Sequence, residues 1–334
     1  LRRHTDVTVT RTVLPEDVVV DNMDEVLWRL RSFCGLHASR GSRIVAIGGP
    51  NSWGWPLEKT LEQVGRLWKL DIRTVSYEQL GKLVRAARDD KTAVSRARER
   101  ADEYLKIPET KLETDRQFVD NAFLLDHVFR GLMRQCDCRA ITVSECMSTI
   151  MPLSQTTACM TLSTLNDAGF LAFCESDFVV VPSGILMGNI SGRPTFLNDP
   201  TYPHDGIITL AHCTGPRRMD GKTLQKARIV THFESDFGAS PKPEWPKGQV
   251  LTDIAPDFKS ERWMGLLAEV VDSPFLDICR DQIDVRYRVA DQLVAERMPG
   301  FHWMTGYGDY TRELGYALRR VGIAWDNLDE SAKA

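Results

Sequence analysis

Short apolar strands alternate with amphipathic helices through the first part of the chain, and this alternation limits the fold more than any other feature. The segment "SRIVAIGGP" predicts a strand that ends in two glycines, and "PLEKTLEQVGRLWKL" predicts the helix that follows it. "DIRTVSY" predicts a second strand, and "EQLGKLVRAARDDKTAVSRARERADEYLK" predicts one long helix with a charged, solvated face. Strands that alternate with helices favour a parallel sheet covered by helices, so we expect a doubly wound, flavodoxin-like or Rossmann-like α/β domain.

Two further strands continue the alternation, and each of them runs into an acidic residue. "ETDRQFVDNAFLLDHVFRGLMRQ" predicts a helix that leads into the strand "RAITVSE", which ends in Glu145. "TTACMTLSTLNDAG" predicts a helix that leads into the strand "FLAFCESD", which contains Glu175. The two carboxylates follow equivalent ends of successive strands. We therefore expect them to lie side by side at one edge of the sheet.

Beyond about residue 205 the pattern changes from helices to strands. The pieces "GIITLAHC", "KARIVTHFES", "GQVLTDIAP" and "QIDVRYR" read as strands, and turns rich in proline and glycine separate them. Short strands separated by turns are typical of a β-barrel or sandwich. The helix "DYTRELGYALRRVG" follows them near the end of the chain. We expect an α/β part over residues 1–204, which carries the acids, and a β-rich, barrel-like part over residues 205–334.

Charge and cysteine usage exclude several classes of function. A net charge of −4 over 334 residues argues against nucleic acid or an anionic membrane surface as the main partner. No apolar run approaches the roughly 20 residues that span a bilayer. The opening "LRRHTDVTVTRTV" alternates like a strand and lacks the apolar core of a secretory signal. The eight cysteines are scattered and form no framework, so we expect free thiols and a cytoplasmic protein.

The stretch "LAFCESDFVV" drives two acids, Glu175 and Asp177, into an apolar run. Burying a carboxylate without a partner costs much free energy. We therefore expect these acids to pair with a cation, bind a metal ion or transfer protons. His212 in "TLAHCTGP" and His302 in "PGFHWMTGYG" also lie in apolar contexts. Taken singly, Glu145 also suits a helix N-terminus, and each histidine suits a packed core. Together, carboxylates and imidazoles are the ligands of a divalent ion such as Mn²⁺, with Mg²⁺ or Co²⁺ as alternatives.

Three segments carry a likeness to a known family. They are "CESDFVVVPSGILMGNISGRPTFLNDP", "FLNDPTYPHDGIITLAHCTGP" and "GFHWMTGYGDYTRELGYALRRVGI". Each is similar to a segment of the L-fucose isomerase and L-arabinose isomerase superfamily. The first is similar to an acidic strand end followed by a helix, and the second to a turn before a metal-binding histidine. The third is similar to a C-terminal metal-binding histidine before a helix. The chain resembles these metal-dependent aldose–ketose isomerases over roughly residues 40–330, most specifically in 171–216 and 299–325.

The resemblance implies roles for individual residues. Glu145 and Glu175 match the two metal-binding acids, which also form the acid/base pair of a cis-enediol proton transfer, and His212 and His302 match the metal-binding histidines. Asp177 is the alternative to Glu175 as second acidic ligand, since residues two apart share a strand face, and we favour Glu175. Four residues near the matched segments are candidates for contacts with substrate oxygens: Asp199, His204, Arg193 and Arg280.

The resemblance also implies an activity and an architecture. It predicts a divalent-metal-dependent aldose–ketose isomerase for a small sugar or sugar derivative, built as an α/β domain and a barrel and assembled as a trimer or hexamer. A lyase, epimerase or rearrangement enzyme that uses the same enediolate on a modified sugar acid stays open, as does a sugar-binding protein without catalysis. The isomerases have an additional N-terminal domain that helps to form the neighbouring subunit's site, and this sequence is expected to begin near their second domain. Substrate recognition is therefore not implied.

Overall fold

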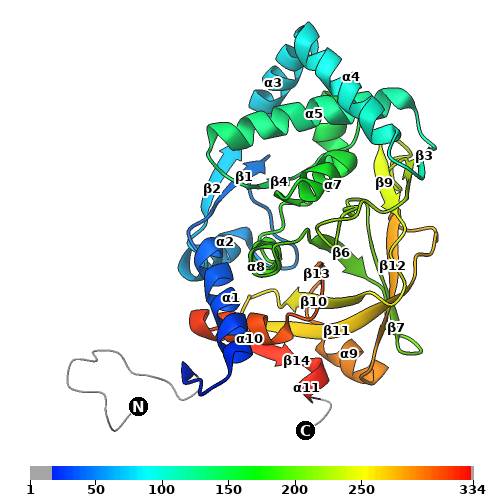
Figure 1. Cartoon of the computed structure of the whole chain (residues 1–334). Helices are drawn as coiled ribbons and strands as arrows, with labels where there is room; N and C mark the ends of the chain where they lie inside the picture. The colour runs from blue at the N-terminus through cyan, green and yellow to red at the C-terminus, as the bar shows by residue number, and fades with distance from the viewer. Residues whose placement is uncertain (1–16, 332–334) are drawn as a thin grey trace.

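The computed structural model describes residues 17–331, and the first part of the chain surrounds a four-stranded parallel sheet (Figure 1). Its strands lie in the order β2-β1-β4-β5. Their bounds are β1 (Arg43–Ile47), β2 (Asp71–Val75), β4 (Ala140–Val143) and β5 (Leu171–Phe173). Each pairing is parallel, so the carboxyl ends of these strands meet at one edge of the sheet.

Helices cover both faces of this sheet (Figure 1). Because side chains alternate along a strand, Val45 and Ile47 of β1 pack with residues of α3, α5 and α7, whereas Ile44 and Ala46 pack with α2 and α8. The predicted parallel α/β sheet is confirmed. The helices are α1 (Met23–Ser39), α2 (Leu57–Leu67), α3 (Tyr77–Asp89), α4 (Lys91–Leu105), α5 (Arg116–Gln135), α6 (Met151–Ser154), α7 (Cys159–Asp167) and α8 (Val181–Ser191).

The long charged segment forms two helices, and the prediction of one helix is wrong. The break is at Asp90, whose backbone is extended and whose carboxylate accepts a hydrogen bond from the N–H of Thr92 at 2.8 Å. Aspartate stabilises the first turn of a helix in this position, so Asp90 ends α3 and starts α4.

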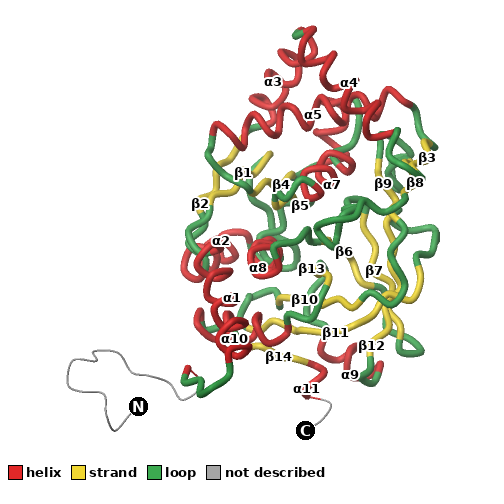
Figure 2. Tube along the Cα trace, in the orientation of Figure 1, coloured by secondary structure: helices red, strands yellow, loops and turns green. Residues whose placement is uncertain are grey.

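Six strands of the second part close into an antiparallel barrel, which confirms the predicted barrel-like architecture (Figure 2). They are neighbours in the order β10-β13-β6-β7-β12-β11, and the pairing of β10 with β11 closes the ring. An apolar interior that includes Leu210, Ile283 and Trp303 fills it. The barrel begins with β6, so it takes one strand from residues 1–204. The strands are β6 (Phe196–Pro200), β7 (Ile207–His212), β10 (Val250–Pro256), β11 (Arg262–Asp272), β12 (Asp281–Tyr287) and β13 (Trp303–Tyr307).

Smaller elements surround the barrel. A three-stranded sheet in the order β3-β8-β9 joins a strand of the α/β part to two strands that lie between β7 and β10 in the chain. β14 pairs in parallel with β11. The remaining elements are β3 (Thr110–Leu112), η2 (Cys146–Ile150, a turn of π-helix), β8 (Ala227–Val230), β9 (Ser240–Pro243), α9 (Asp291–Arg297), α10 (Thr311–Val321), β14 (Ala324–Asn327) and α11 (Leu328–Ser331).

The acidic stretch after β5 is not the strand that the sequence predicts. β5 ends at Phe173, and the backbones of Glu175 and Ser176 are left-handed, with φ of 66° and 47°. This conformation is strained for residues other than glycine and breaks the strand. Asp177 therefore lies beyond a turn, so it does not share a strand face with Glu175.

Two sequence predictions concern the opening segment and membrane-spanning helices. The strand-like pattern of the opening segment lies outside the described residues. Within residues 17–331, the helices are all too short or too polar to cross a membrane.

Asp253 gives the first testable prediction, because this fully buried acid lies inside the barrel. Burial raises its pKa from 3.8 to about 7, although the hydroxyl of Thr305 donates to it. The folded protein therefore binds the proton more tightly than the unfolded chain, and this stabilisation is lost as the pH rises from about 4 through 7. The full effect is about 4 kcal/mol, from about 1.4 kcal/mol per pKa unit. Urea unfolding should show a smaller loss of stability between pH 5 and pH 8 in Asp253→Asn than in wild type, and equal losses would contradict the assignment.

Candidate functional site

The site lies where the carboxyl edge of the parallel sheet meets one end of the barrel. β4 and β5 are parallel neighbours, so Glu145 and Glu175 follow adjacent strands as predicted. The barrel contributes three residues from β6, from β7 and from the residue before β13: Asp199, His212 and His302. Segments that are far apart in the sequence thus converge on the turn after β5.

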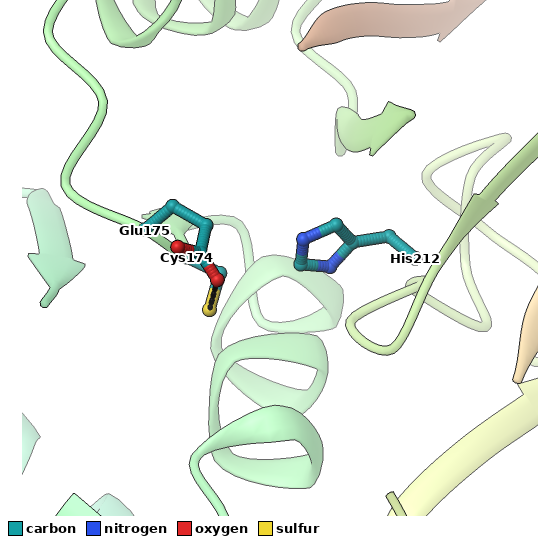
Figure 3. A group of neighbouring side chains, drawn as sticks. All are labelled: Cys174, Glu175 and His212. Carbon is teal, nitrogen blue, oxygen red and sulfur yellow. Dashed lines mark hydrogen bonds between the residues drawn. The ribbon is translucent and has the colours of Figure 1, made fainter. Parts of the chain in front are cut away.

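Five side chains form two overlapping groups of possible metal ligands. In one group, ligand atoms of Cys174, Glu175 and His212 all lie within 4.8 Å of one another. In the other, the same holds for Asp199, His212 and His302. Figure 3 shows the carboxylate of Glu175 and the sulfur of Cys174 on the side of the His212 ring that faces the α/β part. We call these five residues the ligand cluster: Cys174, Glu175, Asp199, His212 and His302.

Asp177 holds His302 in place. One carboxylate oxygen of Asp177 lies 2.8 Å from Nδ1 of His302, and the other accepts hydrogen bonds from the backbone N–H groups of Trp53 and Val179. Nε2 of His302 lies 3.4 Å from Oδ1 of Asp199. Asp177 is thus occupied in orienting the imidazole, the arrangement that carboxylates adopt behind metal-binding histidines. Of the two alternatives for the second acid, Glu175 belongs to the ligand cluster and Asp177 does not.

The pKa values of the two histidines shift in opposite directions. Burial, with the charges of His302 and His232, lowers the pKa of His212 to about 3, so His212 is neutral at neutral pH. Its Nδ1 lies 3.2 Å from the hydroxyl oxygen of Thr214. Burial lowers the pKa of His302, but the hydrogen bond to Asp177 and the charge of Asp199 raise it by more, so the net shift is upward. A neutral imidazole is the form that binds a metal ion, and His212 is already in it.

The two half-buried carboxylates of the ligand cluster have few partners. Burial raises the pKa of Asp199 to about 7, and its buried Oδ1 makes no hydrogen bond among residues 17–331, only the 3.4 Å ion-pair contact with Nε2 of His302. Burial also raises the pKa of Glu175, and the neighbouring Cys146 and Glu234 add to the rise. A carboxylate oxygen without a hydrogen bond, close to the neutral imidazole of His212 that both ligand groups share, fits a divalent cation.

The structure does not bring Glu145 into the ligand cluster. Glu145 is exposed, its backbone is left-handed with φ of 51°, and its carboxylate accepts a hydrogen bond from the hydroxyl of Ser148. Glu145 belongs to neither group of ligand atoms, although β4 and β5 are neighbours and a turn of π-helix follows it directly. Adjacent strand ends are therefore not sufficient to pair these carboxylates.

Three predicted substrate contacts are not members of the ligand cluster either. His204 is at the tip of the β6–β7 hairpin with its side chain 65 % exposed, at the far end from Asp199 and His212. Arg193 precedes β6 and donates to the carbonyl of Tyr307 at 3.1 Å. Arg280 donates to the carbonyl of Thr231 and to Asp236, so it fixes the loop between β8 and β9.

That loop carries two residues that the sequence analysis missed. His232 is buried, and its Nε2 lies 3.7 Å from Oε2 of Glu234. The charge of Glu234 contributes to the raised pKa of Glu175 and of Asp199, so Glu234 lies near the ligand cluster. The signal available in the sequence was "THFES", two titratable side chains around an aromatic residue directly after a strand.

An aromatic pair borders the site. The rings of Trp53 and Phe301 stack with centroids 5.5 Å apart, and Trp53 also meets His302 edge-on at 5.7 Å. Trp53 is 41 % exposed and Phe301 is 52 % exposed, so they form an open apolar wall beside the buried charges. This wall suits a ligand that has both an apolar face and polar edges.

A comparison with protein-family models finds no match to the chain, and no curated protein matches it. Membership of a family is therefore not shown, and the function must be argued from the ligand cluster itself.

Proposed function

We propose that the protein is a divalent-metal-dependent aldose–ketose isomerase that acts on a small sugar or sugar derivative. The observation that carries this proposal is the convergence of two half-buried acids and two histidines, Glu175, Asp199, His212 and His302, from opposite parts of the fold, in two groups that share His212. The resemblance to fucose and arabinose isomerases supports the same reading through three of these four residues.

Glu175, Asp199, His212 and His302 would hold the ion, for which Mn²⁺ is our first choice and Mg²⁺ or Co²⁺ the alternatives. When bound, such an ion polarises a carbonyl oxygen and stabilises the negative charge that develops on substrate oxygens. Asp177 keeps the His302 ring in its binding orientation through the 2.8 Å contact. Cys174 lies 3.9 Å from Oε1 of Glu175 and supports that carboxylate from behind.

Two carboxylates are available for proton transfer. Glu175 takes a proton from the carbon next to the carbonyl, and the electrons of that C–H bond form the enediol double bond. As that double bond forms, the carbonyl π electrons move onto the carbonyl oxygen. The same carboxylate then returns its proton to the former carbonyl carbon, while Asp199 moves the proton of the neighbouring hydroxyl to the former carbonyl oxygen, which leaves the new carbonyl on the neighbouring carbon. Asp199 takes this second role in place of Glu145, because Asp199 lies within the ligand cluster and Glu145 is turned away. The wall of Trp53 and Phe301 would face the apolar side of the sugar ring.

A screen of aldoses and ketoses with Mn²⁺, read by product identification, tests the proposal. Interconversion of an aldose and its ketose, lost when the metal is chelated, is the expected result. An epimer or a cleavage product would assign the enediolate chemistry to an epimerase or lyase instead. Sugar binding without metal and without turnover would leave only a binding function.

The homo-oligomer implied by the resemblance is supported by one outward face of α1. Met23, Leu27, Leu30 and Cys34 follow one another at spacings of four, three and four residues, as in a helix–helix seam, and all are exposed. Asp24 lies near one end of this face and His37 near the other, so the same helix of an antiparallel second copy would meet it with opposite charge when His37 is protonated.

Light scattering after gel filtration should therefore show more than one copy of the 37.8 kDa chain per particle. Leu27→Glu with Leu30→Glu should shift the particle to a smaller assembly, because it places four like charges in a two-fold seam. The matched control, Leu112→Glu on the exposed edge strand β3, should leave the mass unchanged. An unchanged mass for the double variant would exclude α1 as the interface.

A further inference from the structure

A cavity of about 410 Å³ lies against the small β3-β8-β9 sheet and is lined by basic side chains. Its wall contains four cations and two carboxylates. Two of the cations are paired at the rim, Lys226 with Glu244 at 2.6 Å and Lys247 with Asp272 at 3.0 Å. Arg228 is paired from outside the cavity with Glu113, so the one lining cation without an ion pair among the described residues is Lys242.

Lys242 is buried without a partner. It is 5 % exposed, and its Nζ makes neither a hydrogen bond nor an ion pair with any residue of the described chain. A second donor nearby, Nε1 of Trp245, is likewise buried without an acceptor, and Trp245 lines the same cavity. Proteins rarely bury an ammonium group in this way, because the loss of its hydration is not compensated.

Strand register brings a second positive charge beside Lys242. Arg228 of β8 lies directly opposite Lys242 of β9 in the antiparallel ladder, and like charges in that position repel. Both side chains also lie over the ring of Phe275, Arg228 at 4.4 Å and Lys242 at 5.8 Å from its centroid. Arg228 has one partner outside the cavity, Glu113.

No acid of the described chain neutralises Lys242 by direct contact. The buried Asp281 is near enough to influence its charge, but the two make no ion pair within 4.0 Å, and the backbone N–H of Gly215 donates to Asp281. Burial also raises the pKa of Asp281, which favours its uncharged form. The cavity is therefore lined by the unpaired ammonium of Lys242, by the guanidinium of Arg228 that Glu113 pairs from outside, and by Trp245, whose indole N–H has no acceptor among the described residues.

We propose that this cavity binds a tetrahedral oxyanion, the phosphate group of a small molecule, with Lys242, Arg228 and Trp245 as its donors. Phosphate suits an ammonium beside the guanidinium N–H groups that Glu113 does not use, and it relieves the repulsion between the two side chains. Phe275, which is 46 % exposed, leaves room for an apolar portion beside the charged group. The site is separate from the ligand cluster and needs no metal and no turnover.

Calorimetric titration of the wild-type protein with inorganic phosphate, sulfate and fructose 6-phosphate, at constant ionic strength in chloride buffer with EDTA, tests the proposal. Binding of inorganic phosphate is the expected result. Tighter binding of the sugar phosphate would identify a phosphate ester as the ligand, and equal binding would identify the free oxyanion. No binding of any of the three would overturn the proposal. Because EDTA removes divalent metal, this result is independent of the isomerase proposal.

Lys242→Met should weaken phosphate binding about tenfold or more, the loss expected for one charge-assisted hydrogen bond. Its melting temperature without phosphate should rise, since the variant removes a buried, unpartnered charge. A purely structural lysine would give a lower melting temperature and unchanged phosphate affinity, which would contradict the proposal. Lys82→Met on the exposed face of α3 is the matched control and should change neither quantity. If Lys242→Met does not fold, Arg228→Gln should show the same loss of phosphate binding, and its absence would refute the site.

Discussion

Glu175→Gln is expected to lower the rate of the proposed sugar isomerisation by about 10³-fold, within the usual range for loss of a general base. Glu175 is the acid of the ligand cluster that the turn after β5 delivers to the site, and its amide analogue cannot accept the proton from carbon. The measurement is the initial rate with the best sugar from the screen, at saturating Mn²⁺. Circular dichroism of the variant should match wild type.

Glu145→Gln is the matched control for this prediction. The two acids follow neighbouring strands, but Glu145 is exposed and accepts a hydrogen bond from Ser148. The turnover of Glu145→Gln should therefore stay within about threefold of wild type. Equal losses in both variants would restore the pair that the sequence analysis predicts and would show that Glu145 rotates into the site. An unchanged rate for Glu175→Gln would remove Glu175 from the proton-transfer role.

His212→Gln is expected to weaken Mn²⁺ binding by more than about 100-fold, because His212 belongs to both groups of ligand atoms. Asp177→Asn should have a smaller effect, about tenfold, since Asp177 acts only by orienting His302. Titration of the metal-free protein with Mn²⁺, followed by electron paramagnetic resonance of the free ion, measures both. His204→Gln, at the exposed hairpin tip, is the control and should bind as wild type does. Equal affinities in all three variants would place the ion elsewhere.

The architecture was accessible from the sequence because it is encoded in local periodicity. The run "RIVAI" is apolar at successive positions, as a strand buried on both faces must be, and β1 is such a strand. The barrel strands were recognisable by their short lengths and the turns between them. The prediction of one long helix over residues 78–106 was wrong because the helical periodicity continues across Asp90. The charged residues around Asp90 hid its preference for the first position of a helix.

The site was only partly accessible, since backbone conformation decides where each acid points. Residue type alone singled out Glu175, His212 and His302, because carboxylates and imidazoles are unusual in apolar runs. The left-handed residues after β4 and β5 carry no glycine or asparagine signal, so nothing predicted that Glu145 would turn outward.

Two further features of the site depend on tertiary contacts. Asp199 was predicted only as a contact with substrate oxygens, yet the pairing of β6 with β7 brings it beside His212 as a possible metal ligand. Glu234 lies in a loop whose position is set by contacts such as that of Arg280 with Asp236, which no short-range pattern encodes.

Elemental analysis of the purified protein, together with anomalous diffraction from crystals grown with Mn²⁺, tests the ligand cluster most directly. We predict one ion per chain, bound by side-chain atoms of Glu175, Asp199, His212 and His302 at about 2.0–2.6 Å. A protein that takes up no divalent ion, with His302 held as an internal ion pair between Asp177 and Asp199, would contradict the account.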